Sequence, residues 1–163
     1  MKGAKGKKLA IIVPYTENKL DEMYKFSGHM EYFLEDKMDY TIHFINQKYA
    51  DMYFNYGKLC NIGFDLTKDD NDYFVFHDID ILPKDERCDY WYSDKPTHLC
   101  SNLRPYADWI GGAFKINKQQ FQKINGFSND YWGGVFHWND LHYRLNKMGY
   151  LTLSKFFTKN IYK

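Results

Sequence analysis

Two aspartates, Asp78 and Asp80, directly follow an apolar run and could together bind a metal ion. The run, residues 72–77, has the β-branched and aromatic composition of a buried strand. Open parallel sheets bind their ligands at the carboxyl ends of the strands. Two carboxylates at that position can present oxygens to one hard divalent cation, and the cation can neutralise a diphosphate leaving group. Asp-x-Asp also occurs by chance in solvated turns, but the preceding strand favours the metal site.

Two glycine pairs follow aromatic residues and are candidates for contact with a ligand. They are Gly111-Gly112 and Gly133-Gly134. Paired glycines allow a ligand to approach the backbone closely or act as hinges, and the alternative is two tight turns. Aromatic rings near these glycines suit stacking on sugars or bases, although core packing is the default for any single ring. These rings are Tyr106, Trp109, Tyr131, Trp132 and Trp138.

Two of the six histidines bear on the chemistry. His77 adjoins Asp78, but neighbouring residues of a strand point to opposite faces. We therefore expect His77 to pack beside the site and not to bind the same ion. His137 lies in the unusual segment 133–140, and its imidazole could act as a metal ligand or as a base. The sequence contains no nucleophile elbow and no phosphate-loop motif, so a hydrolase triad has no support.

Strands and helices that could position these residues alternate along the first half of the chain. Residues 9–13 form a continuous apolar run closed by Pro14, which is typical of a strand buried on both faces. Alternation of strand and helix indicates right-handed crossovers, a parallel sheet and the α/β class. Residues 84–106 are expected to form loops with short strands. The other predicted elements are helices at 19–34, 54–66, 118–124 and 139–148 and strands at 40–45 and 72–77.

The composition is that of one ordinary soluble domain. The chain has 163 residues, 44% of them hydrophobic, and a formal net charge of +1. Such a charge disfavours a general nucleic-acid binder, and no apolar run is long enough to span a membrane. We expect a single domain over residues 1–163 with residues 1–7 flexible. Three cysteines without a CxxC pair indicate a reducing compartment, and without a visible signal peptide or anchor the predicted location is cytoplasmic.

Several segments together resemble the β-1,4-galactosyltransferases, glycosyltransferase family 7, and most closely the xylosylprotein β-1,4-galactosyltransferase branch. Residues 8–15 are similar to the first strand and Pro-Phe turn of the family. Residues 77–83 are similar to its Asp-Val-Asp metal motif with the trailing Leu-Pro. Further similar segments follow in the same order, at 29–30, 33–34, 45–47, 54–55, 58–59, 61–64, 111–112, 118–119, 125–126 and 131–133.

The resemblance implies a GT-A, Rossmann-like fold with a mostly parallel central sheet flanked by helices. It implies a Mn²⁺-dependent transfer, with inversion, from a UDP-sugar to a carbohydrate acceptor, and UDP-galactose is the favoured donor. A Golgi location would follow by analogy with animal relatives. The residues implied are Pro14, Tyr15 and Phe54 at the uridine, Asp78 and Ile79 at the nucleotide, Asp80 at the metal, and Tyr106, Trp109, Gly111 and Gly112 along donor and acceptor. Apart from the resemblance, Asp78 and His137 are further candidate metal ligands because of their side-chain chemistry.

The chain departs from the family pattern at the nucleotide site. The family turn carries arginines where this chain has Thr16 and Asn18, and another arginine where it has Tyr56. Because arginine binds phosphates through paired hydrogen bonds, these replacements reduce the number of contacts expected with the diphosphate and the uridine.

A second departure affects the base. Where the family has an acidic stretch, the glutamate becomes His137, the expected base becomes Trp138, and only Asp140 stays acidic. Asp140 and His137 are therefore the candidate catalytic residues. The alternative function is a nucleotide-sugar or carbohydrate-binding module of the same fold with impaired catalysis. A metal-dependent phosphoryl hydrolase has less support, because no other acidic cluster supplies a second metal.

Overall fold

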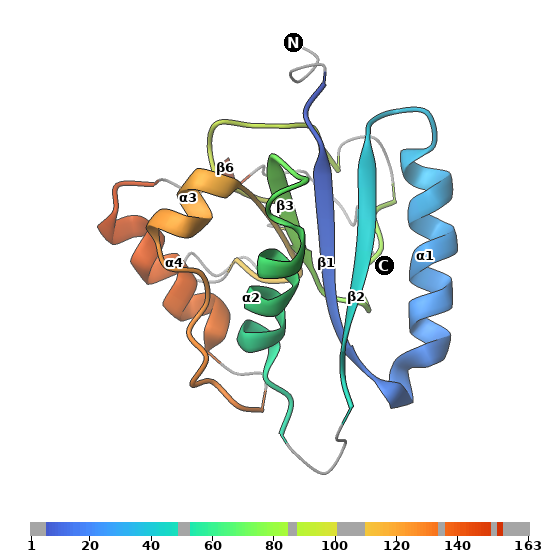
Figure 1. Cartoon of the computed structure of the whole chain (residues 1–163), viewed down its shortest axis with the longest axis horizontal. Helices are drawn as coiled ribbons and strands as arrows, with labels where there is room; N and C mark the ends of the chain where they lie inside the picture. Colours follow the sequence, from blue (N-terminus) through green and yellow to red (C-terminus); the bar gives the residue numbers. More distant parts are fainter. Residues whose placement is uncertain are drawn as a thin grey trace.

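A computed structural model describes residues 6–48, 53–84, 88–100, 110–133 and 136–150, and the backbone of 153–154 (Figure 1). The strands and helices alternate in the first half of the chain, as predicted. In chain order they are β1 (Leu9–Thr16), the 3-10 turn η1 (Glu17–Lys19), α1 (Leu20–Leu34), β2 (Tyr40–Gln47), α2 (Tyr56–Thr67), β3 (Tyr73–His77), β4 (Thr97–His98), β5 (Ala113–Asn117), α3 (Lys118–Lys123), α4 (His137–Lys147) and β6 (Leu153–Ser154).

The strands form one six-stranded sheet in the order β2-β1-β3-β5-β4-β6. β1 pairs in parallel with β2 and β3, and β4 pairs in parallel with β6. β5 runs antiparallel to both of its neighbours, β3 and β4. The predicted α/β class and mostly parallel sheet are confirmed, and β5 is the strand that makes the sheet mixed.

β1 is buried on both faces because its side chains alternate between two hydrophobic cores. Leu9, Ile11 and Val13 join the core beneath α1, while Ala10 and Ile12 join the core beneath α2, α3 and α4. In Figure 1, α2 crosses in front of the sheet with α3 and α4 beside it, and α1 lies beyond β2. An alternation of this kind fixes the register, since a slip of one residue would exchange the two faces.

Most predicted bounds agree with the structure to within two residues. α2 begins at Tyr56 and not at residue 54, because Asn55 caps it: the Asn55 side chain accepts a hydrogen bond from the Lys58 amide at 3.0 Å. α4 begins at His137, two residues before the predicted start. β5 was not predicted as a strand. Lys7, at the end of the segment expected to be flexible, forms an ion pair with Asp72 at 2.9 Å.

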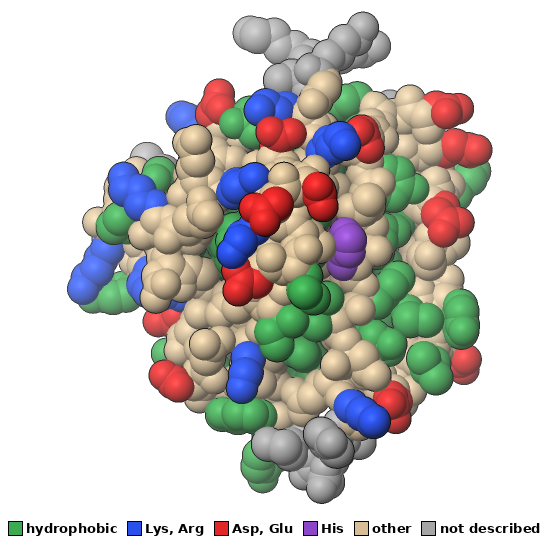
Figure 2. Space-filling view, viewed as in Figure 1, with side chains coloured by type: hydrophobic (Ala, Val, Ile, Leu, Met, Phe, Trp, Pro, Cys, Tyr) green, Lys and Arg blue, Asp and Glu red, His purple; other side chains and the backbone are tan. Residues whose placement is uncertain are grey.

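The surface agrees with the near-zero net charge. On the face that Figure 2 shows, Lys and Arg side chains are interspersed with Asp and Glu side chains. A phosphate backbone would require a continuous basic surface, which this face does not present. Within the described ranges, no helix combines the length and the apolar character that a membrane span requires.

A glycine of α2 sets how closely this helix packs on the sheet. A Cβ on Gly63 would lie 2.5 Å from Cγ2 of Ile12 and 3.0 Å from Cγ1 of Ile45. We expect Gly63→Ala to lower the free energy of unfolding by about 1–3 kcal/mol, because the helix must move away from β1 and β2. Urea denaturation measures the change.

Gly28 of α1 is the matched control, since a Cβ there would meet nothing within 4 Å. Gly28→Ala is expected to raise the free energy of unfolding by about 0.5–1 kcal/mol, the usual gain in a helix. Changes of the same sign in both variants would contradict the close packing of Gly63.

Candidate functional site

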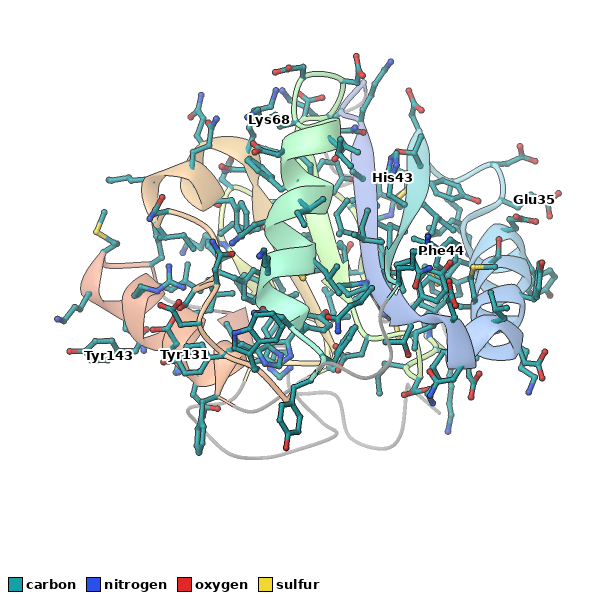
Figure 3. The ribbon with its side chains drawn as sticks, turned by 60° about the horizontal axis from the view of Figure 1, so that its bottom comes forward. Glu35, His43, Phe44, Lys68, Tyr131 and Tyr143 are labelled. Atoms are coloured by element: carbon teal, nitrogen blue, oxygen red, sulfur yellow. The ribbon has the colours of Figure 1, made fainter. Side chains whose placement is uncertain are left out.

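The carboxyl ends of three parallel strands meet at one edge of the sheet, which is the lower edge in Figure 1. β1 ends there at Thr16, β2 at Gln47 and β3 at His77. Figure 3 turns this edge toward the viewer. The segment that follows β3 contains Asp78 and Asp80, so the predicted position of the aspartates at the end of a strand agrees with the structure.

The segment 78–80 is anchored by its backbone and by the buried Ile79. The Asp78 amide donates to the Gly112 carbonyl at 2.7 Å, and the Asp78 carbonyl accepts from the Ile81 amide at 3.2 Å. Ile79 is only 8% exposed and packs in the core beneath α1. Asp78 is half-buried, whereas the Asp80 side chain is 61% exposed. Asp80 is thus an accessible carboxylate at the carboxyl edge of the sheet.

A lysine contacts this carboxylate. Lys19, the last residue of η1, places its Nζ 3.2 Å from Oδ1 of Asp80 and 3.3 Å from Oε1 of Glu22. Its hydrogen bonds to these carboxylates, first that to Asp80, raise the pKa of Lys19 above its ordinary value. Lys19 is therefore a cation at neutral pH. No sequence pattern pointed to Lys19, although it lies directly after the turn where the family pattern has arginines.

His77 packs beside the site, as predicted. Its Nδ1 lies 2.9 Å from the Asp78 carbonyl oxygen, and its Nε2 lies 2.7 Å from the Tyr90 hydroxyl. Because a carbonyl only accepts, Nδ1 carries the proton and the Tyr90 hydroxyl donates to Nε2. Burial lowers the pKa of His77 to about 4, so the ring is neutral and holds the Asp78 backbone in place.

Three residues predicted at the uridine lie on segments that meet this edge. Pro14 and Tyr15 are near the end of β1, and the Tyr15 ring packs edge-to-face on Phe44 at 6.1 Å between centroids. Figure 3 shows Phe44 between β2 and α1. Phe54 precedes α2 and is half-buried, and its carbonyl accepts a hydrogen bond from the Gly133 amide at 2.9 Å. Gly133 thus brings the segment before α4 against Phe54.

The glycine pair Gly111-Gly112 lies against the end of β3. The Gly111 carbonyl accepts from Nε2 of His98 at 2.8 Å, and the Gly112 carbonyl accepts from the Asp78 amide. Gly112 has φ +89°, a left-handed conformation that favours glycine. The pair thus contacts the segment 78–80 through its backbone, and contact of these glycines with a ligand stays a prediction. Tyr106, Trp109 and Gly134 lie outside the described residues.

A buried aromatic cluster of Tyr56, Phe127, His137 and Trp138 joins α2 to the start of α4. The His137 ring stacks on Tyr56 with centroids 4.7 Å apart and an interplanar angle of 23°. Trp138 lies 5.2 Å from both Tyr56 and Phe127. Tyr56 and His137, each 5% exposed, thus occupy together positions where the resemblance has an arginine and a glutamate.

The cluster contains three polar atoms that lack hydrogen-bond partners within the described part of the chain: the Tyr56 hydroxyl and both ring nitrogens of His137. Burial, and after it the Asp78 carboxylate, raise the pKa of Tyr56 well above its usual range. Burial lowers the pKa of His137 to about 4. Both groups are therefore neutral at pH 7, and the effect of Asp78 on Tyr56 indicates that the cluster lies close to the site.

Asp140, a predicted candidate base, is held in an ion pair on α4. Its Oδ2 accepts hydrogen bonds from Nε and Nη2 of Arg144 at 2.9 and 2.7 Å. The Nη1 of Arg144 also donates to the carbonyls of Ile124 and Gly126. Asp140 lines a groove between α2, α3 and α4, and the described residues that line this groove do not include Asp78 or Asp80. Asp140 and His137 remain candidates for the base, and of the two only His137 belongs to the aromatic cluster near Asp78.

The residues present supply part of a metal site. In the ranges that the structure describes, no three His, Cys, Asp or Glu residues form a group that could hold a metal ion. Asp80 provides one accessible carboxylate, a hard oxygen ligand of the kind that Mn²⁺ accepts. The site therefore fits a cation that takes its other ligands from water and from a bound phosphate group, as Mg²⁺-like ions commonly do.

Comparison with known families defines the class of protein to which this fold and site belong. A family model described as the N-terminal region of glycosyl transferase group 7 matches residues 2–93. A second, described as the N-terminal domain of galactosyltransferase, matches residues 98–152. The chain belongs to the glycosyltransferase group 7 family, as the sequence resemblance predicted.

Individual relatives are β-1,4-galactosyltransferases. The chain is 37% identical over 151 residues to β-1,4-galactosyltransferase 1 of Mus musculus, covering 87% of this chain and 37% of the relative. It is 37% identical over 133 residues to β-1,4-galactosyltransferase 7 of Mus musculus, covering 77% and 40%. The chain thus spans about two fifths of the length of these relatives.

Two solved structures of Drosophila β-1,4-galactosyltransferase 7 have the same fold. A complex of a variant with manganese, UDP-Gal and xylobiose matches with a TM-score of 0.86 and 28% identity, covering 96% of this chain and 69% of that one. The catalytic domain in complex with xylobiose matches with a TM-score of 0.85 and 30% identity, covering 94% and 66%. The predicted GT-A fold is confirmed.

Proposed function

We propose that this chain binds UDP-galactose with Mn²⁺ and acts in an inverting transfer of the sugar to a carbohydrate acceptor. The observation that carries the proposal is Asp80, an exposed carboxylate at the carboxyl edge of the sheet. It stands in a fold whose solved relative binds manganese, UDP-Gal and xylobiose. Because the chain spans only part of its relatives, the proposal concerns the site that these residues form.

The proposed donor site uses residues of three segments at the edge of the sheet. Pro14 and Tyr15 at the end of β1, with Phe54 before α2, would contact the uridine, and the segment 78–79 would contact the nucleotide. Asp80 would hold the metal, with Asp78 as a candidate second ligand. The metal, when bound, would neutralise the charge that develops on the departing UDP.

Two residues are candidates for the base of the proposed transfer, Asp140 and His137. Inverting transfer needs a group that takes the proton of the attacking acceptor hydroxyl. Asp140 could do so only if it left its ion pair with Arg144. His137 is neutral and its ring nitrogens have no described partner, which leaves them available to a ligand if the cluster opens.

Two variants test these candidates. If Asp140 is the base, Asp140→Asn should abolish transfer and leave UDP binding intact, with thermal stability measured in parallel because the variant weakens the pair with Arg144. Retained transfer would exclude Asp140.

If His137 is a metal ligand, His137→Ala should weaken Mn²⁺ binding, and an unchanged affinity would exclude that role.

A binding module without transferase activity is the second candidate. It is favoured by the neutral, buried His137 and Trp138 at positions where the resemblance has acids, and by the ion pair that holds Asp140. Calorimetry with UDP and UDP-galactose, with and without Mn²⁺, tests donor binding. Turnover of UDP-galactose, by transfer or by slow hydrolysis, then separates the two candidates. Mn²⁺-dependent binding without turnover favours the module, and no binding at all contradicts both.

A further inference from the structure

Lys19 interacts directly with the proposed metal ligand. Its Nζ lies 3.2 Å from Oδ1 of Asp80 and 3.3 Å from Oε1 of Glu22. The Lys19 side chain is 38% exposed and that of Asp80 is 61% exposed, so both are accessible to a ligand. The ion pair joins η1, which follows β1, to the segment that follows β3. It therefore links the turn directly after the proposed uridine residues of β1 to the segment that carries the proposed metal ligand.

A divalent cation and the Lys19 ammonium would compete for the same carboxylate. A metal ligated by Asp80 lies about 2 Å from a carboxylate oxygen, and Nζ is already in contact with Oδ1. Two positive charges a few ångströms apart repel each other. The ammonium must therefore withdraw, or an anion must lie between the two cations and be neutralised by both.

We propose that Lys19 is a counter-cation of Asp80 that gives way to the divalent metal and then binds the diphosphate of the nucleotide. The inference rests on the proposed function and adds to it a specific binding residue. The long, flexible stem of lysine allows Nζ to move a few ångströms while its backbone stays in η1. The displaced ammonium stays near the metal, where the phosphate oxygens of a metal-bound nucleotide would be.

This role of Lys19 would couple the metal to the nucleotide. Without nucleotide, metal binding must break the pair between Lys19 and Asp80, which lowers the affinity for the metal. With nucleotide, the diphosphate offers Lys19 a new anionic partner, so each ligand strengthens the binding of the other. A lysine with a purely structural role would not affect the two affinities in opposite directions.

Lys19→Gln in the whole chain tests the inference, with free Mn²⁺ measured by electron paramagnetic resonance and UDP binding by calorimetry. Without nucleotide, the affinity for Mn²⁺ should rise about three- to fivefold, the scale of an exposed ion pair. At saturating Mn²⁺, the affinity for UDP should fall about tenfold, the scale of a hydrogen bond between charged groups. Lys19→Arg should keep both affinities near those of the wild type.

Lys25→Gln is the matched control, since Lys25 is exposed on α1 and the substitution removes the same charge. It should change both affinities less than twofold. If Lys19→Gln leaves both affinities unchanged, or shifts both in the same direction, the role of Lys19 is overturned. The donor site itself still stands in that case, provided that the wild type binds UDP with Mn²⁺. A wild type that binds neither Mn²⁺ nor UDP would overturn the donor site together with the inference.

Discussion

Acidification from pH 6.5 to pH 4 is expected to unfold the protein, because three histidines are buried in their neutral form. Burial lowers the pKa of His77, His98 and His137 to about 4 in the folded state. In the unfolded chain a histidine titrates near its ordinary pKa of about 6.5. Between these two values the unfolded chain takes up protons that the folded protein does not.

The sign of the effect follows from proton linkage. A lowered folded-state pKa contributes stability that is present above pH 6.5 and is lost as the pH falls toward 4. Each histidine would lose about 2 kcal/mol of stability by pH 5 and about 3 kcal/mol by pH 4. Together the three losses are comparable with the total free energy of unfolding of an ordinary domain, about 5–15 kcal/mol.

Urea denaturation at pH 7.5, 6 and 5 measures this loss. His137→Phe is the informative variant, because His137 has no hydrogen-bond partner among the described residues and Phe keeps the ring stacked on Tyr56. Its free energy of unfolding should fall less steeply between pH 6 and 5, by about 1 kcal/mol per pH unit. A stability of the wild type that stays constant from pH 7.5 to 5 would contradict the expectation.

Asp80→Ala is expected to abolish Mn²⁺-dependent stabilisation by UDP. A ligand at one hundred times its dissociation constant stabilises the folded state by about 2.7 kcal/mol, or about 5–10 °C in Tm for a chain of this size. The variant should lose that shift because Asp80 is the accessible carboxylate proposed to hold the metal. The ligand-free Tm should barely change, since the side chain is 61% exposed.

Differential scanning fluorimetry with UDP, with and without Mn²⁺, measures the shift. Asp69→Ala is the matched control, because Asp69 is exposed in the turn that leads from α2 to β3, at the opposite edge of the sheet. Lys68, its neighbour, lies at the far end of α2 in Figure 3. A Mn²⁺-dependent shift that survives in Asp80→Ala would show that the nucleotide is held elsewhere.

The first half of the fold could be predicted because its signals are local. Residues 9–13 are apolar throughout since both faces of β1 are covered, and the helical period of α1 and α2 reports one buried face for each. The placement of Asp78 and Asp80 at the carboxyl edge of the sheet followed from the strand before them. The start of α2 differed by two residues from the prediction because capping by Asn55 depends on a side-chain hydrogen bond.

The remaining features depend on contacts between distant residues. β5 has only five residues, one of them the buried Lys115, and it is stabilised by pairing with β3 and β4. The stacking of His137 on Tyr56 joins α4 to α2, and no local sequence pattern indicates that these two helices contact each other. The hydrogen bonds from Arg144 to carbonyls of the 124–126 segment cannot be predicted from the helical periodicity of α4 either. Sequence patterns could therefore propose Asp140 as a base but could not reveal its ion pair.

The position of β5 between β3 and β4 has a consequence for the order in which the protein assembles during synthesis. β1, β2 and β3 are the first three strands of the chain and can pair as soon as residue 77 has left the ribosome. The side of β3 that later pairs with β5 then has no partner strand. Such an edge can pair with other chains. The hydrogen bond from the Asp78 amide to the Gly112 carbonyl also cannot form until residue 112 has been synthesised. The edge that carries Asp80 is therefore completed only after β5 has been synthesised, and until then the unpaired side of β3 is open to aggregation.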